Sequence, residues 1–128
     1  MRLLLDTHVL LWSFYRPERL SRSAQELIQD TDNAVLFSAA SMWEIAIKAA
    51  LRRDDFQIEP DRILELMDAA GFIEIPVTSR VAVAVRDLPQ HHGDPFDRLL
   101  VAQAIAEPAI LLTADRKLQA YSDLVRLI

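Results

Sequence analysis

The sequence predicts an α/β fold, a three-layer α/β/α sandwich around a central, mostly parallel sheet. Short apolar runs alternate along the chain with longer segments whose apolar residues recur at helical spacing. The short runs lack polar alternation, which is typical of parallel strands buried on both faces. The chain has 128 residues, of which 52% are hydrophobic. This length and composition predict a single domain over residues 1–128 with a core of its own.

The N-terminal segment begins this alternation. Arg2–Leu5 is the first predicted strand, and Thr7–Tyr15 follows it with helical spacing. Pro17 ends this helix because proline lacks the backbone donor that a helix needs. Ser21 is the predicted N-cap of a second helix, which runs to about Thr31.

The next strand–helix unit is bounded by polar and special residues. Ala34–Phe37 is the second predicted strand, and either Ser38 or Ser41 caps the helix after it. Pro60 stands where a further helix can begin, because the first turn of a helix leaves its amides unpaired in any case. Gly71 is the predicted stop of that helix, since glycine readily adopts the left-handed conformation.

The second half of the chain repeats the pattern. The predicted elements are a strand over Phe72–Ile75, a helix over Thr78–Leu88, a polar loop over Pro89–Pro95 and a helix over Phe96–Ala106. They are followed by a strand over Ile110–Thr113, a short helix over Asp115–Tyr121 and a last strand over Val125–Ile128. Asp94 is expected to cap the helix that starts at Phe96. In an open parallel sheet of this kind, ligands bind beyond the carboxyl ends of the strands.

The composition limits the chemistry. The chain has no cysteine, which excludes disulfides and thiolate metal sites and leaves oxygen or imidazole ligands for hard cations such as Mg²⁺ or Mn²⁺. The formal net charge of −5 argues, taken alone, against a nucleic-acid binder. Bound cations would reverse that field locally. We see no signal peptide and no apolar run of roughly 18 residues, and expect a cytoplasmic protein without a membrane span.

Four acidic residues fall at the predicted carboxyl edge of the sheet. Asp6 ends the first strand, Glu44 lies early in the helix after the second, Asp97 opens the helix before the fourth, and Asp115 follows the fourth. Gathered carboxylates repel one another unless a cation lies between them. Two magnesium or manganese ions about 4 Å apart can activate a water and stabilise the leaving oxygen in phosphodiester cleavage. The set therefore predicts a metal-dependent nuclease.

Each of these acids also has a structural alternative, which the residues leave open. Asp6 and Asp115 can cap the helices that follow them. Asp97 can complement the positive end of its helix. Glu44 can form an ordinary helical ion pair with Lys48, four residues on. None of these roles excludes metal binding.

Several segments resemble the PIN-domain family, and in particular the VapC-type ribonuclease toxins of toxin–antitoxin pairs. The matching segments, in the same order, are Leu5–His8, Ser38–Ile45, His92–Ala104 and Thr113–Asp115. The most specific of them reads Asp-Pro-Phe-Asp-Arg with Ala-Gln-Ala behind it. The resemblance covers essentially the whole chain.

This resemblance implies a Mg²⁺-dependent endoribonuclease with a doubly wound α/β/α fold. Asp6, Glu44, Asp97 and Asp115 match the family's acidic quartet, and Thr113 matches a hydroxyl that supports the site. Asp6 and Asp97 match the usual direct metal ligands, and Glu44 and Asp115 would complete the catalytic site directly or through water. The resemblance also implies a VapB-like antitoxin that fills the cleft, an RNA substrate and a homodimer.

Substrate binding needs cations near the acids. Lys48 and Arg98 are the predicted RNA phosphate contacts because each lies beside one of the four acids. Most other basic residues are expected to be solvated surface charges: Arg16, Arg19, Arg22, Arg52, Arg53, Arg116 and Lys117. The aromatic group on the first helix is expected to pack in the core, or to serve a dimer or antitoxin surface where exposed: Trp12, Phe14 and Tyr15.

Four alternative functions follow from other interpretations of the same residues. The principal one is a catalytically silent PIN-fold binding module that acts within a protein–RNA complex. A metal-free ribonuclease would use His8, His91 or His92 as acid and base. An aspartyl phosphatase would want a second acid at the position of His8, and a receiver domain would want an acid where Ser38 follows the second strand.

Overall fold

The structure is a computed structural model that describes residues 1–51, 57–91 and 93–128. Within these residues, five parallel strands form one sheet in the order β3-β2-β1-β4-β5. The strands are β1 (Arg2–Leu5), β2 (Ala34–Ser38), β3 (Ile73–Ile75), β4 (Ile110–Thr113) and β5 (Val125–Leu127). The predicted fold class is confirmed, and all five strands lie where the sequence predicts them to within one residue at either end.

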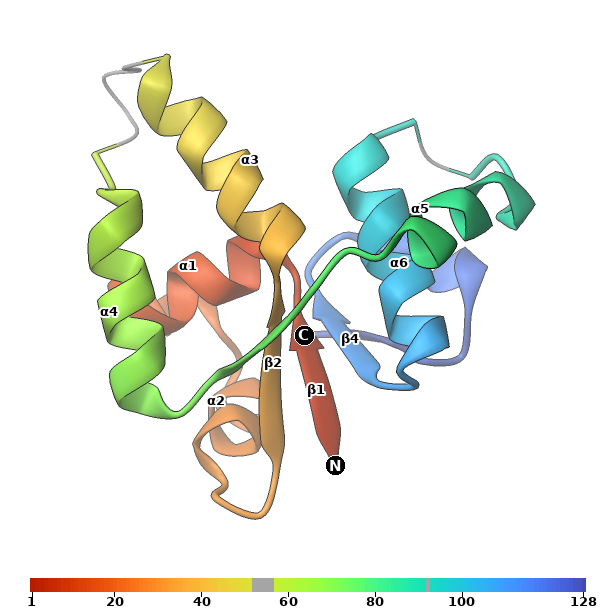
Figure 1. Ribbon diagram of the computed structural model, residues 1–128. Helices are drawn as coiled ribbons and strands as arrows, with labels where there is room; N and C mark the ends of the chain where they lie inside the picture. Colours follow the sequence, from red (N-terminus) through yellow and green to blue (C-terminus); the bar gives the residue numbers. More distant parts are fainter. Residues whose placement is uncertain (52–56, 92) are drawn as a thin grey trace.

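Helices cover both faces of this sheet (Figure 1). One layer consists of α1 (Thr7–Tyr15), the 3₁₀ helix η1 (Pro17–Arg19), α2 (Arg22–Gln29), α3 (Ala39–Ala50) and α4 (Pro60–Ala70). The other consists of α5 (Ser79–Ala84), the 3₁₀ helix η2 (Val85–Asp87), α6 (Pro95–Ala106) and the 3₁₀ helix η3 (Arg116–Tyr121). Among the described residues no helix is both long and apolar enough to cross a bilayer.

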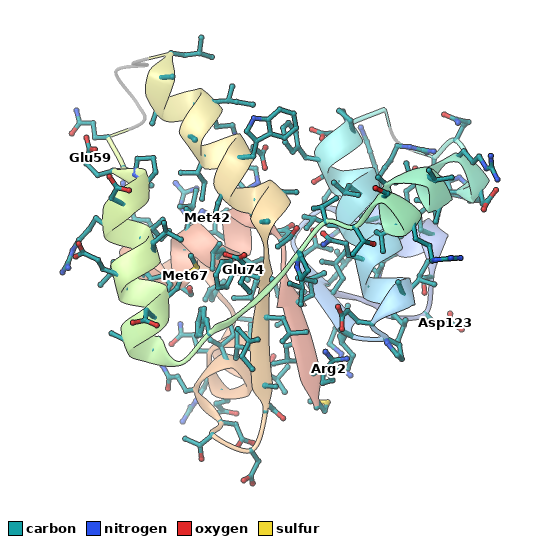
Figure 2. The ribbon with its side chains drawn as sticks, in the orientation of Figure 1. Arg2, Met42, Glu59, Met67, Glu74 and Asp123 are labelled. Atoms are coloured by element: carbon teal, nitrogen blue, oxygen red, sulfur yellow. The ribbon has the colours of Figure 1, made fainter. Side chains whose placement is uncertain are left out.

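Alternation along each strand divides the core into two clusters, because successive side chains of a strand point to opposite faces. Leu3 and Leu5 of β1 pack under the layer that contains α1 to α4, while Leu4 packs under α6. Met67 of α4 belongs to the first cluster and Met42 of α3 packs against it, on the side where these two helices face each other (Figure 2). Burial on both faces explains why the strands read as unbroken apolar runs.

Local capping confirms most predicted helix boundaries. Ser21 accepts a hydrogen bond from the amide of Ala24 and caps α2. Of the two candidate caps for α3 it is Ser38 that serves, and Asp94 caps α6 as expected. Gly71 ends α4 with a φ of 77°, a left-handed conformation that side chains disfavour.

Two predicted helices differ from the observed ones. The helix expected over Thr78–Leu88 is a short α-helix, α5, followed by the 3₁₀ turn η2, and the helix expected after Asp115 is the 3₁₀ helix η3. In the first case, the carbonyl of Val85 accepts a hydrogen bond from the Arg98 guanidinium. Alternating valines also have low helix propensity, which favours an early end.

Candidate active site

The order of the strands fixes where a ligand can enter. From β1 the chain first builds β2 and β3 on one side, and then returns to build β4 and β5 on the other side. The crevice at such a reversal, beyond the carboxyl ends of the strands, is where open α/β sheets bind ligands. Asp6 follows β1 and Thr113 ends β4, so both residues lie at this point.

Asp6 is almost completely buried, with 5% of its surface exposed. One carboxylate oxygen accepts a 2.8 Å hydrogen bond from the amide of Val9 and so caps α1. Burial raises the pKa of this carboxyl above its ordinary value, and the nearby charge of Glu44 adds to the rise. Hydrogen bonds to Asp6 and the charge of His8 oppose it. The ionised form of Asp6 would therefore gain from a cation placed beside it.

The Thr113 hydroxyl connects two of the predicted site acids. It donates a hydrogen bond to the second carboxylate oxygen of Asp6. The same oxygen of Thr113 accepts a 3.0 Å hydrogen bond from the amide of Asp115. Asp115 in turn accepts from the amide of Lys117 and caps η3. Thr113 thus holds the carboxylate of Asp6 and the backbone of Asp115 in fixed relation.

Three of the four acids line a single pocket. It has a volume of about 300 Å³ and is lined by Asp6, His8, Trp12, Asp97, Ala114 and Asp115. Over residues 1–51, 57–91 and 93–128, however, no three acidic or histidine side chains are already close enough together to hold a metal ion. The structure therefore brings the acids around one hollow without drawing them into a ligand shell. Carboxylate oxygens are the donors that a hard divalent cation prefers, so the residues fit such an ion.

Glu44 occupies a different position. Its carboxylate lies 3.4 Å from the Lys48 ammonium, in the helical ion pair that the sequence allows as an alternative. Glu44 does not appear among the described residues that line the pocket, although it is near enough to Asp6 to influence its pKa. Lys48 is correspondingly paired, with a third of its side chain exposed.

Arg98 corrects one expectation. The side chain of this residue is buried, and its guanidinium donates hydrogen bonds to the carbonyls of Pro89 and Val85 and to the Tyr121 hydroxyl, at 2.8, 3.1 and 3.0 Å. These contacts argue against the predicted phosphate contact and assign Arg98 a structural role. Asp97, one residue earlier, lines the pocket instead.

Two buried polar connections were not anticipated from the sequence. Gln103 of α6 is 2% exposed; its side chain accepts a 2.5 Å hydrogen bond from Ser38 and donates to the carbonyl of Pro76. The Thr7 hydroxyl donates to the Ser41 hydroxyl at 3.0 Å, which ties α1 to α3. A glutamine inside the apolar run of α6 was the available signal, because a buried amide needs partners.

The two described histidines, His8 and His91, have different surroundings. His8 lines the pocket, whereas the ring of His91 packs against Tyr121 with centroids 5.1 Å apart. His92 lies outside the described residues, as do Arg52 and Arg53. Among the aromatic residues of α1, Trp12 lines the pocket, Phe14 packs against Phe72, and Tyr15 is 39% exposed.

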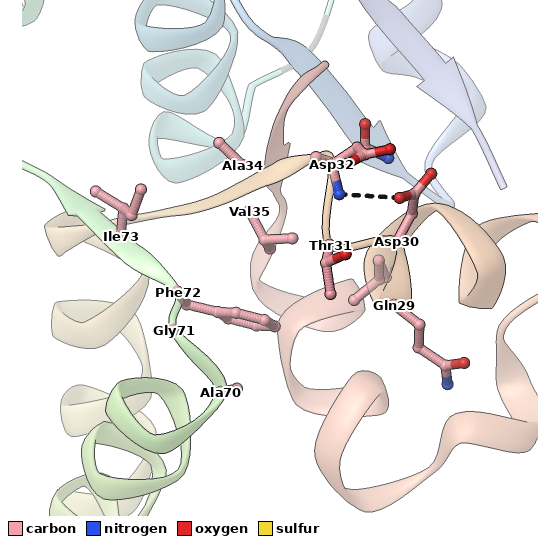
Figure 3. A pocket seen from close by; sticks show the side chains of 12 residues that line it. Gln29, Asp30, Thr31, Asp32, Ala34, Val35, Ala70, Gly71, Phe72 and Ile73 are labelled. Atoms are coloured by element: carbon pink, nitrogen blue, oxygen red, sulfur yellow. Dashed lines mark hydrogen bonds between the residues drawn. The ribbon is translucent and has the colours of Figure 1, made fainter.

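A second hollow lies at the opposite, amino-terminal edge of the sheet (Figure 3). It has a volume of about 420 Å³ and is formed by the segments that enter β2 and β3. Asp30 and Asp32 are both exposed there. One carboxylate oxygen of Asp30 accepts a hydrogen bond from the amide of Asp32, which stabilises the turn before β2.

Comparison with known proteins places these observations in a family. The model of the PIN domain matches residues 3–124. The ribonuclease VapC22 of Mycobacterium tuberculosis (strain ATCC 25618 / H37Rv) is 34% identical over 119 residues, which cover 92% of this chain and 90% of that protein.

Solved structures agree on the fold. VapBC2 from Rickettsia felis, bound to a DNA fragment from its promoter, contains a chain that superposes with a TM-score of 0.71 at 16% identity, covering 100% of this chain and 98% of that chain. FitAcB from Neisseria gonorrhoeae superposes with a TM-score of 0.61 at 19% identity, covering 98% and 96%. At these identities the likeness concerns the fold alone.

Proposed function

The chain belongs to the PIN-domain family, in its VapC-type branch, and from this premise we propose that it is a metal-dependent endoribonuclease that acts as the toxin of a toxin–antitoxin pair. The observation that carries the proposal is the buried Asp6 carboxylate, held by Thr113 in a pocket that Asp97 and Asp115 also line. The 34% identity to a ribonuclease over nearly the whole chain supports the same activity.

In this proposal Asp6, Asp97 and Asp115 hold a Mg²⁺ or Mn²⁺ ion. When bound, the ion would supply Lewis-acid stabilisation of the phosphate oxygens and an activated water. Thr113 orients Asp6 through its hydrogen bond, and the surrounding apolar core keeps that carboxylate poorly solvated. The negative charge of Glu44 acts on the Asp6 carboxylate from outside the pocket. The Lys48 ammonium, paired with Glu44, offsets part of this repulsion.

We further propose that a VapB-like antitoxin binds this chain and covers the pocket, and that the chain forms a homodimer. The resemblance to VapC22 and the fold shared with VapBC2 and FitAcB support a role in such a pair. Growth arrest on expression of the chain alone, relieved by co-expression of its antitoxin, is the expected cellular result.

The direct test is cleavage of RNA by the purified chain. We expect structured RNA to be cut in single-stranded loops when magnesium is present and to remain intact when a chelator replaces it. Asp97→Asn should reduce the rate by about two orders of magnitude or more, because a metal ligand contributes several kcal/mol to the transition state. Asp32→Asn is the matched control, since it makes the same change at an exposed acid of the other edge.

Three results would contradict the proposal. Cleavage that survives chelation would favour a metal-free histidine mechanism. Full activity of Asp97→Asn would refute the assignment of this residue. RNA that is bound but never cut would instead support a catalytically silent binding module.

A further inference from the structure

One wall of the pocket carries aromatic side chains for which the proposed cleavage chemistry has no role. His8 and Trp12 line the pocket together with Asp6 and Asp97. They are four residues apart on α1, so they share one side of the helix. Their ring centroids lie 6.0 Å apart and the ring planes are inclined by 48°. The Trp12 indole is half-buried, because part of it packs against the core.

A cation completes this arrangement. The chain reverses after α1, and η1 brings the Arg19 guanidinium over the Trp12 ring, 5.8 Å from its centroid. Such a contact fixes the direction of a long, exposed side chain. His8 and Trp12 thus lie at the pocket with the carboxylates, and Arg19 lies beyond them over the indole. We call His8, Trp12 and Arg19 the α1 strip.

The segment that carries the α1 strip has a net charge opposite in sign to that of the whole chain. Residues 7–22 contain three arginines and one glutamate, a formal charge of +2, whereas the chain as a whole has −5. The arginines that flank Arg19 form exposed pairs with described residues, Arg16 with Glu18 at 3.7 Å and Arg22 with Glu26 at 3.4 Å. Exposed pairs of this kind are weak and exchange readily for other partners.

We propose that the α1 strip binds single-stranded RNA beside the cleavage site, with an unpaired base stacked on Trp12 and a backbone phosphate at Arg19. This inference rests on the proposed function and assigns the direction in which the substrate leaves the pocket. Base–aromatic stacking and a cationic track are the two contacts by which proteins hold single strands. The strip has both, and it is continuous with the pocket that contains the acids.

Single-stranded RNA fits the strip better than a duplex does. A duplex keeps its bases stacked inside, so none is free to meet an indole. The arrangement also explains how an acidic chain can attract a polyanion, because the positive charge lies next to the site.

The first test separates substrate binding from catalysis. With the RNA that the wild-type chain cleaves, Trp12→Leu should raise KM by about tenfold or more, with kcat nearly unchanged. Trp12→Phe should restore most of the loss because it keeps an aromatic face. Arg19→Gln should raise KM severalfold and reduce the salt dependence of binding by about one ion. Arg62→Gln on α4 is the control, as an exposed arginine paired with Glu65.

The second test observes the indole directly. The chain has two tryptophans, Trp12 and Trp43, so Trp43→Phe leaves Trp12 as the only fluorescent indole and Trp12→Phe leaves Trp43. In the Asp97→Asn background, a single-stranded RNA of mixed sequence should quench Trp12 in a saturable manner. The same strand annealed to its complement should not. Trp43, which is 64% exposed on α3, should respond to neither.

The outcomes distinguish this inference from the proposed function. Cleavage by the wild type with an unchanged KM in Trp12→Leu and Arg19→Gln would overturn the α1 strip and leave the ribonuclease intact; the strip would then be a protein-binding surface. Quenching of Trp43 instead of Trp12 would also overturn it. Quenching of Trp12 without any cleavage would refute the proposed function and retain the strip. Melting temperatures of the Trp12 variants show whether a raised KM reflects misfolding.

Discussion

The two edges of the sheet each have a hollow with acidic residues, yet they differ in how those acids are held. The amino-terminal hollow is the larger of the two, about 420 Å³ against about 300 Å³, but its acids are exposed, and the carboxylate of Asp30 accepts a hydrogen bond within a turn. At the carboxyl edge, Asp6 is buried and hydrogen-bonded to a buried hydroxyl. Neither volume nor acid content therefore identifies the site.

Burial of polar groups makes the difference between the edges. The buried polar side chains include Asp6, Thr7, Ser38, Ser41 and Thr113, each at or just beyond the carboxyl end of a strand or early in the next helix. A polar group excluded from water costs free energy unless it is paired. A fold that keeps so many of them at one edge holds its side chains there in defined positions, which a reaction requires and a turn does not.

The largest expected effect contrasts one acid from each edge. Asp6→Ala should lower RNA cleavage by about two orders of magnitude or more, because it removes a proposed metal ligand. Asp30→Ala, at the amino edge, should leave the rate unchanged. Each variant loses the hydrogen bond that its carboxylate accepts from a backbone amide, and Asp6→Ala also loses the one from Thr113. Melting temperatures of both variants therefore have to show that each is folded at the temperature of the assay. Equal loss of activity in the two variants would abolish the distinction between the edges.

A smaller effect tests the hydroxyl that connects two of the acids. Thr113→Val keeps the shape of the side chain and removes its hydrogen bonds to Asp6 and Asp115. Partners that orient metal ligands typically contribute 10- to 100-fold in metal affinity or activity, so we expect a loss of about that size. Titration of magnesium against the cleavage rate measures it. A variant with wild-type magnesium dependence would show that Thr113 is merely a fold contact.

These contrasts also explain which parts of the fold and of the candidate site can be predicted from the sequence. The strands, most helix caps and the positions of Asp6, Asp97 and Asp115 follow from local patterns, because apolar periodicity and capping act within a few residues. The alternation of strand and helix then brings the three acids to one edge. The fold was predictable for the same reason.

Contacts between segments that are distant in the sequence could not be predicted from local patterns. Gln103 meets Ser38 across 65 positions of the chain. Arg98 lies beside a site acid in sequence, which suggested a phosphate contact, but carbonyls at Val85 and Pro89 hold it in the interior. The sequence predicts that Trp12 packs in the core or, where exposed, serves a dimer or antitoxin surface; Trp12 packs against the core in part and also lines the pocket. In each case the partner, and not the residue, decides the role.

The connection made by Gln103 offers the third test. Gln103→Leu leaves the Ser38 hydroxyl and the Pro76 carbonyl without their partner, and should cost about 1–3 kcal/mol of unfolding free energy. Asn33→Ala at the amino edge removes hydrogen bonds at a less buried position, to the N-terminus and to Leu27, and should cost less. Urea unfolding of the two variants measures both. A larger loss for Asn33→Ala would contradict the greater importance of the carboxyl edge.

The smallest expected effect concerns the pH dependence of stability. The pKa of Asp6 is raised in the folded chain, mainly by burial, so the folded state binds a proton more tightly than the unfolded state does. The stabilisation from this proton is complete below the unfolded pKa, near 3.8, and is lost as pH rises through the folded pKa.

Asp6→Asn carries no such charge, and its amide oxygen can still cap α1. With a chelator present, unfolding free energies of the variant and the wild type should therefore diverge as pH rises, with the variant the more stable near neutrality. Asp32→Asn, at an exposed acid of the amino edge, is the control for the substitution itself. A wild type that stays more stable than Asp6→Asn at neutral pH would mean that the hydrogen bonds to Asp6 outweigh the cost of its burial.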